Sequence, residues 1–221
     1  MAFPDHLLPS SWLLPSLLIV IMLLGTAVYT APWRQLRERQ LGNVLLVACV
    51  VLLILWRMRA GFAGGLGLHF LGLTTLTLML GWQFALLGAA LVVTLLSLAG
   101  LGGWQVYALN ILIDGAIPVL FSFAFFRIID RYLPNHFFIY IFVSVFLGSI
   151  LTMSVRLLSL SGLALASGNV ATAELSDALL PSLLLLGLPE GLLNGMALTI
   201  FVVYRPDWVM TFDDARYLDN K

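Results

Sequence analysis

The sequence predicts an all-α integral membrane protein, a polytopic bundle of about seven transmembrane helices. Of its 221 residues, 61% are hydrophobic and only 10% are charged, and the mean hydropathy is +1.04. Soluble domains contain about 45–50% apolar and about 25% charged residues, so this composition indicates a membrane protein. We expect a single membrane domain over residues 1–221, with an N-terminal tail over 1–11, the bundle over 12–204 and a C-terminal tail over 205–221.

Apolar segments of spanning length recur along the whole chain. They cover residues 12–29, 41–56, 66–82, 84–101, 109–126, 136–160 and 179–204. We expect the first segment to be a span and not a cleaved signal, because Met1–Ser11 holds no Lys or Arg for a basic n-region. Only Gly81-Trp82-Gln83 separates the third and fourth segments, so a tight turn is expected there. Glycines at 61, 64, 65 and 67 precede the third segment, which is compatible with a re-entrant piece.

Basic residues fix the expected orientation. With the N-terminus outside, the inner side receives Arg34, Arg37, Arg39, Arg127, Arg131, Arg205, Arg216 and Lys221. The outer side receives only Arg57 and Arg59, while Arg156 falls within the sixth segment. The positive-inside rule therefore predicts an outer N-terminus and an inner C-terminus.

His69 is the polar residue that most needs an explanation, because it starts an apolar stretch that runs almost uncharged to Asp114. An imidazole in hydrocarbon is costly unless both ring nitrogens have partners. Two interpretations remain open: a metal ligand inside the membrane, since imidazole is a common ligand of late transition metals, or a packing histidine with satisfied hydrogen bonds.

Further polar pairs occur at helical spacing within the apolar segments. Asn110 and Asp114 are four residues apart in the fifth segment, and Glu190 and Asn194 repeat this spacing in the seventh. A buried carboxylate there would be protonated, paired or a metal ligand, and interhelical hydrogen bonding is the structural alternative.

Gly187, Gly191 and Gly195 form a stripe at every fourth residue of the last segment. Such a stripe lets a neighbouring helix approach closely, so we expect it to serve packing. Pro189 lies within the stripe and should kink the helix beside Glu190.

The N-terminal segment offers several ligand-type groups. Asp5 and His6 lie beside the free amine of Met1, taken here as the mature start. An amine, backbone amides and an imidazole can together hold Ni²⁺ or Cu²⁺.

These motifs, in their order along the chain, resemble those of the substrate-binding membrane subunit of cobalt and nickel energy-coupling-factor transporters, the CbiM/NikM family. Its start, M-H-I-P-D-G-x-L, resembles Met1-Ala2-Phe3-Pro4-Asp5-His6-Leu7-Leu8, and its later histidine stretch resembles His69-Phe70-Leu71-Gly72-Leu73. Its N-x-x-N-M-G motif resembles Asn110-Ile111-Leu112-Ile113-Asp114-Gly115, and a late V-E-G-L stretch resembles Pro189-Glu190-Gly191-Leu192-Leu193.

The resemblance implies a seven-helix, N-out subunit whose metal ligands are the N-terminal amine, the backbone nitrogen and side chain of the second residue, and the later histidine. Met1 and His69 keep these types, but Ala2 replaces the family's second-position histidine. His6 could supply the missing imidazole, and Asp114 or Asp5 a carboxylate. Mixed nitrogen and oxygen ligands would shift the preference of the site away from square-planar geometry and toward Zn²⁺, Co²⁺, Mn²⁺ or Fe²⁺.

Met1, His6, His69 and Asp114 are therefore the first candidate metal ligands. Further candidates are the backbone of Ala2 and the side chains of Asp5, Asn110 and Glu190.

The resemblance predicts a transport subunit, not an enzyme, in the bacterial plasma (inner) membrane, with a divalent transition metal as substrate, cobalt or nickel first. No cofactor is expected to be resident. The sequence holds no Walker A loop, so ATP hydrolysis would reside in a partner ATPase joined through a transmembrane coupling subunit. Zero net charge argues against nucleic acid as a partner. The alternative is a protein of the same fold with a degenerate metal site, acting as a sensor or structural partner.

Overall fold

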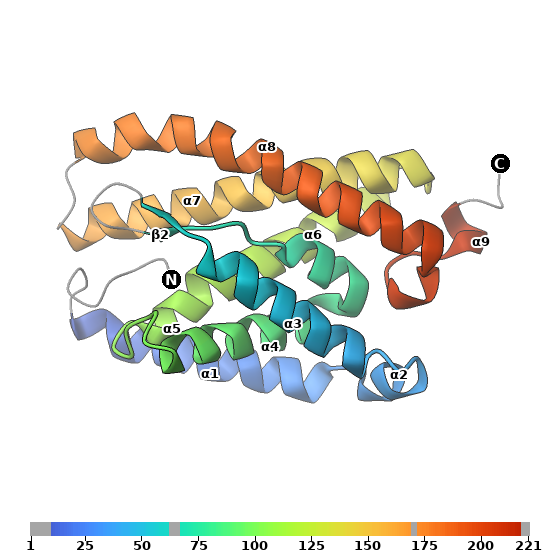
Figure 1. The fold of residues 1–221 in the computed structure, drawn as a ribbon, viewed down its shortest axis with the longest axis horizontal. Helices are drawn as coiled ribbons and strands as arrows, with labels where there is room; N and C mark the ends of the chain where they lie inside the picture. Colours follow the sequence, from blue (N-terminus) through green and yellow to red (C-terminus); the bar gives the residue numbers. More distant parts are fainter. Residues whose placement is uncertain (1–9, 62–66, 169–171, 218–221) are drawn as a thin grey trace.

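The computed structural model describes residues 10–61, 67–168 and 172–217, which form a bundle of helices with one small hairpin of strands (Figure 1). In chain order the elements are η2 (Ser10–Trp12), α1 (Leu13–Thr30), α2 (Trp33–Glu38), α3 (Gly42–Arg57), β1 (Ala60–Gly61), β2 (Gly67–Leu68), α4 (Leu73–Leu98), α5 (Tyr107–Asn110), η4 (Ile111–Ala116), α6 (Ile117–Tyr132), η5 (Ile139–Leu147), α7 (Gly148–Ser167), α8 (Thr172–Tyr204), η6 (Pro206–Trp208) and α9 (Asp214–Tyr217). The elements η4 and η5 are π-helices that continue into α6 and α7.

Five helical stretches of the described residues are long and apolar enough to cross a membrane. They are Leu13–Thr30, Leu73–Leu98, Tyr107–Tyr132, Ile139–Ser167 and Asp177–Tyr204, and the shorter apolar helix Gly42–Arg57 accompanies them. Large hydrophobic side chains are exposed along their outward faces, as a surface in contact with lipid tails requires. The prediction of an all-helical membrane bundle is therefore confirmed.

The predicted tight turn between the third and fourth apolar segments is confirmed at Gly81. Its φ of 85° and ψ of 163° break α4 into residues 73–80 and 82–98. A Cβ placed on Gly88 would lie 3.3 Å from Leu76 Cδ2, whereas residues 12 apart in a straight helix are about 18 Å apart. The two halves therefore fold back on each other, and only a residue tolerant of positive φ fits this turn.

The short half, residues 73–80, begins later than the predicted third segment because β2 and the turn at Gly72 precede it. Gly72 has a left-handed φ of 64° and ends the extended stretch from the hairpin of β1 and β2. With about 1.5 Å of rise per residue, this half-helix is too short to cross a bilayer alone.

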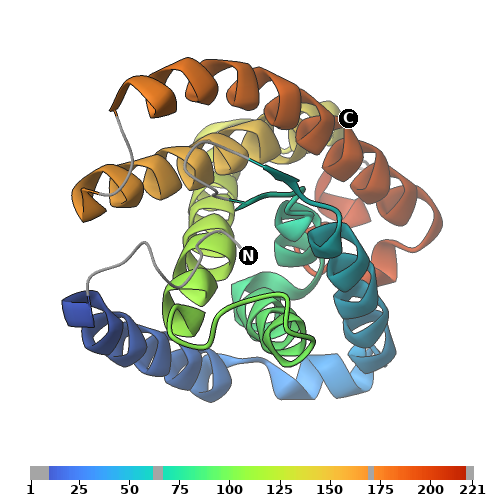
Figure 2. The same ribbon diagram turned by 60° about the vertical axis from the view of Figure 1, so that its left-hand side comes forward.

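The two ends of the bundle carry different groups of loops (Figures 1 and 2). One, here called the His69 end, holds the β1–β2 hairpin and the starts of α1, α5 and α8. The other, here called the C-terminal end, holds α2, the Gly81 turn, the start of η5, and residues 205–217.

The predicted glycine stripe lies where α8 packs on η5 and α7. A Cβ on Gly191 would lie 2.8 Å from Ile150 Cγ1 and 3.0 Å from the carbonyl oxygen of Phe146, whereas a Cβ on Gly195 would come no closer than 3.7 Å to Phe146. The close approach of α8 to η5 and α7 therefore depends on Gly191, which agrees with the packing role expected from the sequence.

We predict that Gly191→Ala lowers the free energy of unfolding by about 1–3 kcal/mol, because the added methyl must displace backbone. Gly195→Ala should be neutral or slightly stabilising, because alanine favours helix and the space is open. Thermal unfolding of both purified variants in detergent compares them. Equal melting temperatures for the two variants would show that Gly191 is not a tight contact.

Candidate functional site

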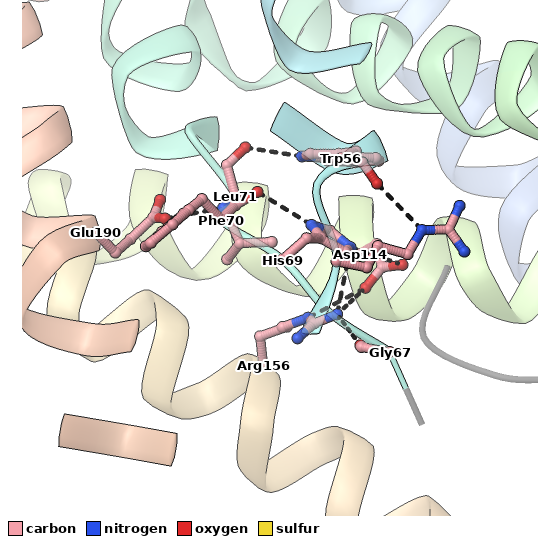
Figure 3. Close-up of polar contacts among 9 residues, drawn as sticks. Trp56, Gly67, His69, Phe70, Leu71, Asp114, Arg156 and Glu190 are labelled. Atoms are coloured by element: carbon pink, nitrogen blue, oxygen red, sulfur yellow. Dashed lines mark hydrogen bonds and ion pairs between the residues drawn. The ribbon is translucent and has the colours of Figure 1, made fainter. Parts of the chain in front are cut away.

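His69 is buried directly after β2, with only 2% of its surface exposed. Its Nδ1 lies 3.0 Å from the carbonyl oxygen of Phe70, and a carbonyl can only accept, so Nδ1 carries the proton. Arg156 Nη2, which can only donate, lies 3.4 Å from the other ring nitrogen, so Nε2 of His69 presents a lone pair. It lies 3.5 Å from Asp114 Oδ2 (Figure 3). The neutral imidazole is therefore held in the tautomer that a metal ligand needs.

The indole of Trp56 holds the imidazole from one side. The two ring centroids are 5.0 Å apart with an interplanar angle of 38°, and Trp56 Nε1 donates to the carbonyl oxygen of Leu71 at 3.0 Å. Trp56 thus fixes both the ring of His69 and the backbone that follows it.

Asp114 comes from the π-helix η4, two turns into the helical stretch that begins at Tyr107. Short π-helical turns within α-helices are frequent at functional sites. Asp114 is fully buried and faces Arg156 of α7, whose Nη2 and Nε donate to Oδ1 at 2.8 and 3.1 Å. Asn110, one turn earlier, is also fully buried.

The guanidinium of Arg156 is fully buried beside both candidate ligands. In addition to its contact with Asp114, Nη2 lies 3.4 Å from His69 Nε2 and 3.2 Å from the carbonyl oxygen of Gly67 (Figure 3). Nη1 of the same side chain is buried and has no hydrogen-bond partner within the part of the chain that the structure describes. Among the residues that the structure describes, the polar centre thus contains the carboxylate of Asp114, the neutral imidazole of His69 and the guanidinium of Arg156.

A second polar cluster holds the loop that carries His69 in place. Glu190 Oε2 and Oε1 accept the backbone N–H groups of Leu71 and Gly72 at 2.8 and 2.7 Å. Asn194 Nδ2 donates to Glu190 Oε1 at 2.8 Å, and its Oδ1 accepts the backbone N–H of Thr75 at 2.9 Å. The first N–H groups of a helix have no partner within it, so α8 caps the half-helix 73–80 from outside. This is the interhelical hydrogen bonding expected as the structural alternative for Glu190 and Asn194.

The other end of the half-helix is held by the C-terminal segment. The backbone N–H of Met210 donates to the carbonyl oxygen of Met79 at 2.7 Å, and Thr211 Oγ1 donates to that of Leu78 at 2.6 Å. The break at Gly81 leaves these carbonyls without helical partners, so residues 210 and 211 satisfy them.

The predicted site residues fall into three groups. His69 and Asp114 are brought together, and Asn110 lies one turn before Asp114 in the same helical stretch. Glu190 lies at the cap of the half-helix, where both of its carboxylate oxygens already accept hydrogen bonds; its interpretation as a metal ligand stays a prediction. Met1, Ala2, Asp5 and His6 lie outside the described residues.

No group of three or more His, Cys, Asp or Glu side chains with metal-binding geometry occurs among residues 10–61, 67–168 and 172–217. Two residues of this site, Arg156 and Trp56, were not among the candidates proposed from the sequence. A charged residue in an apolar segment was the available signal for Arg156, since such a residue must find a buried partner.

Comparisons with known proteins point to one family. Residues 3–208 match the model of the CbiM family, described as the cobalt uptake substrate-specific transmembrane region. No curated protein matches the chain.

Two solved structures have a similar fold. The crystal structure of a truncated transition metal transporter is 14% identical, with a TM-score of 0.77 over 92% of this chain and 99% of that one. The crystal structure of a transition metal transporter is 15% identical, with a TM-score of 0.76 over 91% of this chain and 92% of that one. On the family match over nearly its whole length, this chain belongs to the CbiM family of cobalt uptake transmembrane proteins.

Proposed function

We propose that this chain is the substrate-binding permease subunit of an energy-coupling-factor transporter for a divalent transition-metal ion, with cobalt or nickel as the first expectation. The observation that carries the proposal is the buried His69, whose Nε2 lone pair lies 3.5 Å from the carboxylate of Asp114. Neutral imidazole and carboxylate are ligands that late transition metals accept. The family match supports metal as the substrate class.

The proposed ligand set is Met1, His6, His69 and Asp114, with the Ala2 backbone, Asp5, Asn110 and Glu190 as further candidates. The N-terminal amine and His6 would complete the coordination from outside the polar centre. The metal is cargo in this proposal and would be passed inward after capture.

The proposed topology has about seven transmembrane helices, an outer N-terminus and an inner C-terminus in the bacterial plasma membrane. Six arginines in or next to the loops and tail at the C-terminal end support this orientation through the positive-inside rule; they are Arg34, Arg37, Arg39, Arg131, Arg205 and Arg216. The His69 end would then face outward. A transmembrane coupling subunit and a cytoplasmic ATPase would dock on the opposite end and supply the energy.

A second candidate is a member of the family whose metal site has degenerated and which acts as a sensor or structural partner. Ala2 and the guanidinium of Arg156 beside His69 favour it, because one removes an imidazole and the other places a positive charge at the site.

Metal binding by purified full-length protein distinguishes these candidates. We expect the wild type to bind Co²⁺ or Ni²⁺ in isothermal titration calorimetry, and His69→Ala to weaken binding at least tenfold, which is about 1.4 kcal/mol. His136→Ala is the matched control, since His136 lies at the C-terminal end and its Nδ1 accepts the backbone N–H of Phe138. A wild type without affinity for divalent metals would favour the degenerate-site candidate. Unchanged affinity in both His69→Ala and His6→Ala would refute the proposed ligands.

A further inference from the structure

The guanidinium of Arg156 already occupies the position between the ligand-type atoms of the site. Its Nη2 lies 2.8 Å from Asp114 Oδ1, 3.2 Å from the carbonyl oxygen of Gly67 and 3.4 Å from His69 Nε2. These hydrogen-bond acceptors are a carboxylate, a carbonyl and an imidazole. The same nitrogen and oxygen atoms are the ligands that a divalent transition metal would use. A terminal guanidinium nitrogen has only two hydrogens for three acceptors, so the set is richer than Arg156 needs.

The charges of the site also indicate that the guanidinium takes the place of a cation. Asp114 carries a negative charge that Arg156 neutralises at 2.8 Å, and His69 is neutral, because its Nδ1 donates to Phe70 while its Nε2 faces the donor Nη2 of Arg156. A second arginine, Arg59, donates to the backbone of Trp56 nearby. The Asp114–Arg156 pair has no net charge, so while it is intact the carboxylate of Asp114 attracts a divalent cation only weakly.

We propose that Arg156 is a built-in cation that competes with the transported metal for His69, Asp114 and Gly67, and so sets the affinity of the site. This inference rests on the proposed metal-binding function and names the residue that tunes it. Metal binding then requires the guanidinium to leave Asp114, and return of the guanidinium expels the metal. The competition gives the protein weaker capture than its ligands alone would provide, and a means of release.

The test replaces Arg156 by an uncharged side chain of similar length. Full-length Arg156→Met should bind Co²⁺ at least tenfold more tightly than the wild type in isothermal titration calorimetry, because the guanidinium then no longer neutralises Asp114. Arg156→Lys keeps the positive charge and should stay within about threefold of the wild type, which is under 0.7 kcal/mol. Arg127→Met removes an exposed arginine at the C-terminal end and should leave affinity unchanged. Equal or weaker binding by Arg156→Met would overturn the proposal.

A second measurement covers the case in which Arg156→Met folds poorly because the buried Asp114 has lost its ion pair with Arg156. Saturating Co²⁺ should raise the melting temperature of this variant more than that of the wild type, since the metal replaces the guanidinium as counter-ion. A variant that unfolds early with and without Co²⁺ would also overturn the proposal.

Metal binding through His69 and competition by Arg156 are tested separately. If the wild type binds metal through His69 but Arg156→Met binds no more tightly, only the competition is wrong. If neither the wild type nor Arg156→Met binds any divalent metal, the proposed function fails and the competition fails with it. Binding by Arg156→Met alone would support the competition and would favour the degenerate-site candidate for the wild type.

Discussion

Glu190→Ala should lower the free energy of unfolding by about 3 kcal/mol or more. The change leaves the buried N–H groups of Leu71 and Gly72 without acceptors, and each such group costs about 1–3 kcal/mol. It also removes a partner of Asn194, which caps Thr75 of the same half-helix. For a chain of this size the loss corresponds to a melting temperature lower by roughly 6–12 °C.

The measurement is thermal unfolding of the purified variant in detergent, with Glu38→Ala as the matched control. Glu38 is an exposed partner of Arg34, and exposed pairs contribute about 0–1 kcal/mol. Glu190→Gln keeps one acceptor oxygen and should fall between the wild type and Glu190→Ala. If Glu190→Ala melts like Glu38→Ala, the half-helix does not depend on its cap from α8.

The second large effect concerns the buried ion pair. Asp114→Asn leaves the guanidinium of Arg156 in the protein interior without a negative partner, and breaking a buried pair in this way costs about 3–5 kcal/mol. The double variant Asp114→Asn/Arg156→Met removes both charges together. It should recover most of the lost stability, because uncharged side chains of similar volume often replace a buried pair without loss.

A double-mutant cycle on melting temperature or denaturant midpoint tests this expectation, with Asp207→Asn as the control. Asp207 pairs with Arg205 where both side chains are more than half exposed, so the control should change stability by less than about 1 kcal/mol. Additive effects of Asp114→Asn and Arg156→Met would mean that the two residues are not coupled in the folded protein.

Much of the fold follows from apolar periodicity and glycine. Helix α1 begins within one residue of the predicted segment and α3 likewise, and the reversal at Gly81 lies where only Gly81-Trp82-Gln83 separated two segments. These features are local, because hydrophobic length and backbone freedom at one residue determine them. The helices α6 and α7 continue to Tyr132 and Ser167, beyond the predicted 126 and 160, because polar residues are tolerated in the last turns.

The site was only partly readable from sequence because its contacts are long-range. His69 and Asp114 were singled out one by one as costly polar groups, and the structure places them together. Arg156 joins Asp114 across 42 positions, and Glu190 caps Gly72 across 118. A single sequence carries no signal for such pairings, since the requirement for a partner does not specify which partner is chosen.

The central claim is that His69 holds the transported metal in the full-length protein. X-ray absorption at the cobalt edge of the Co²⁺-loaded wild type and of His69→Ala tests it most directly, because imidazole ligands produce a recognisable outer-shell scattering pattern. We predict that the wild type shows imidazole coordination and that His69→Ala loses an imidazole or binds no cobalt. An identical spectrum for the two proteins would contradict the account.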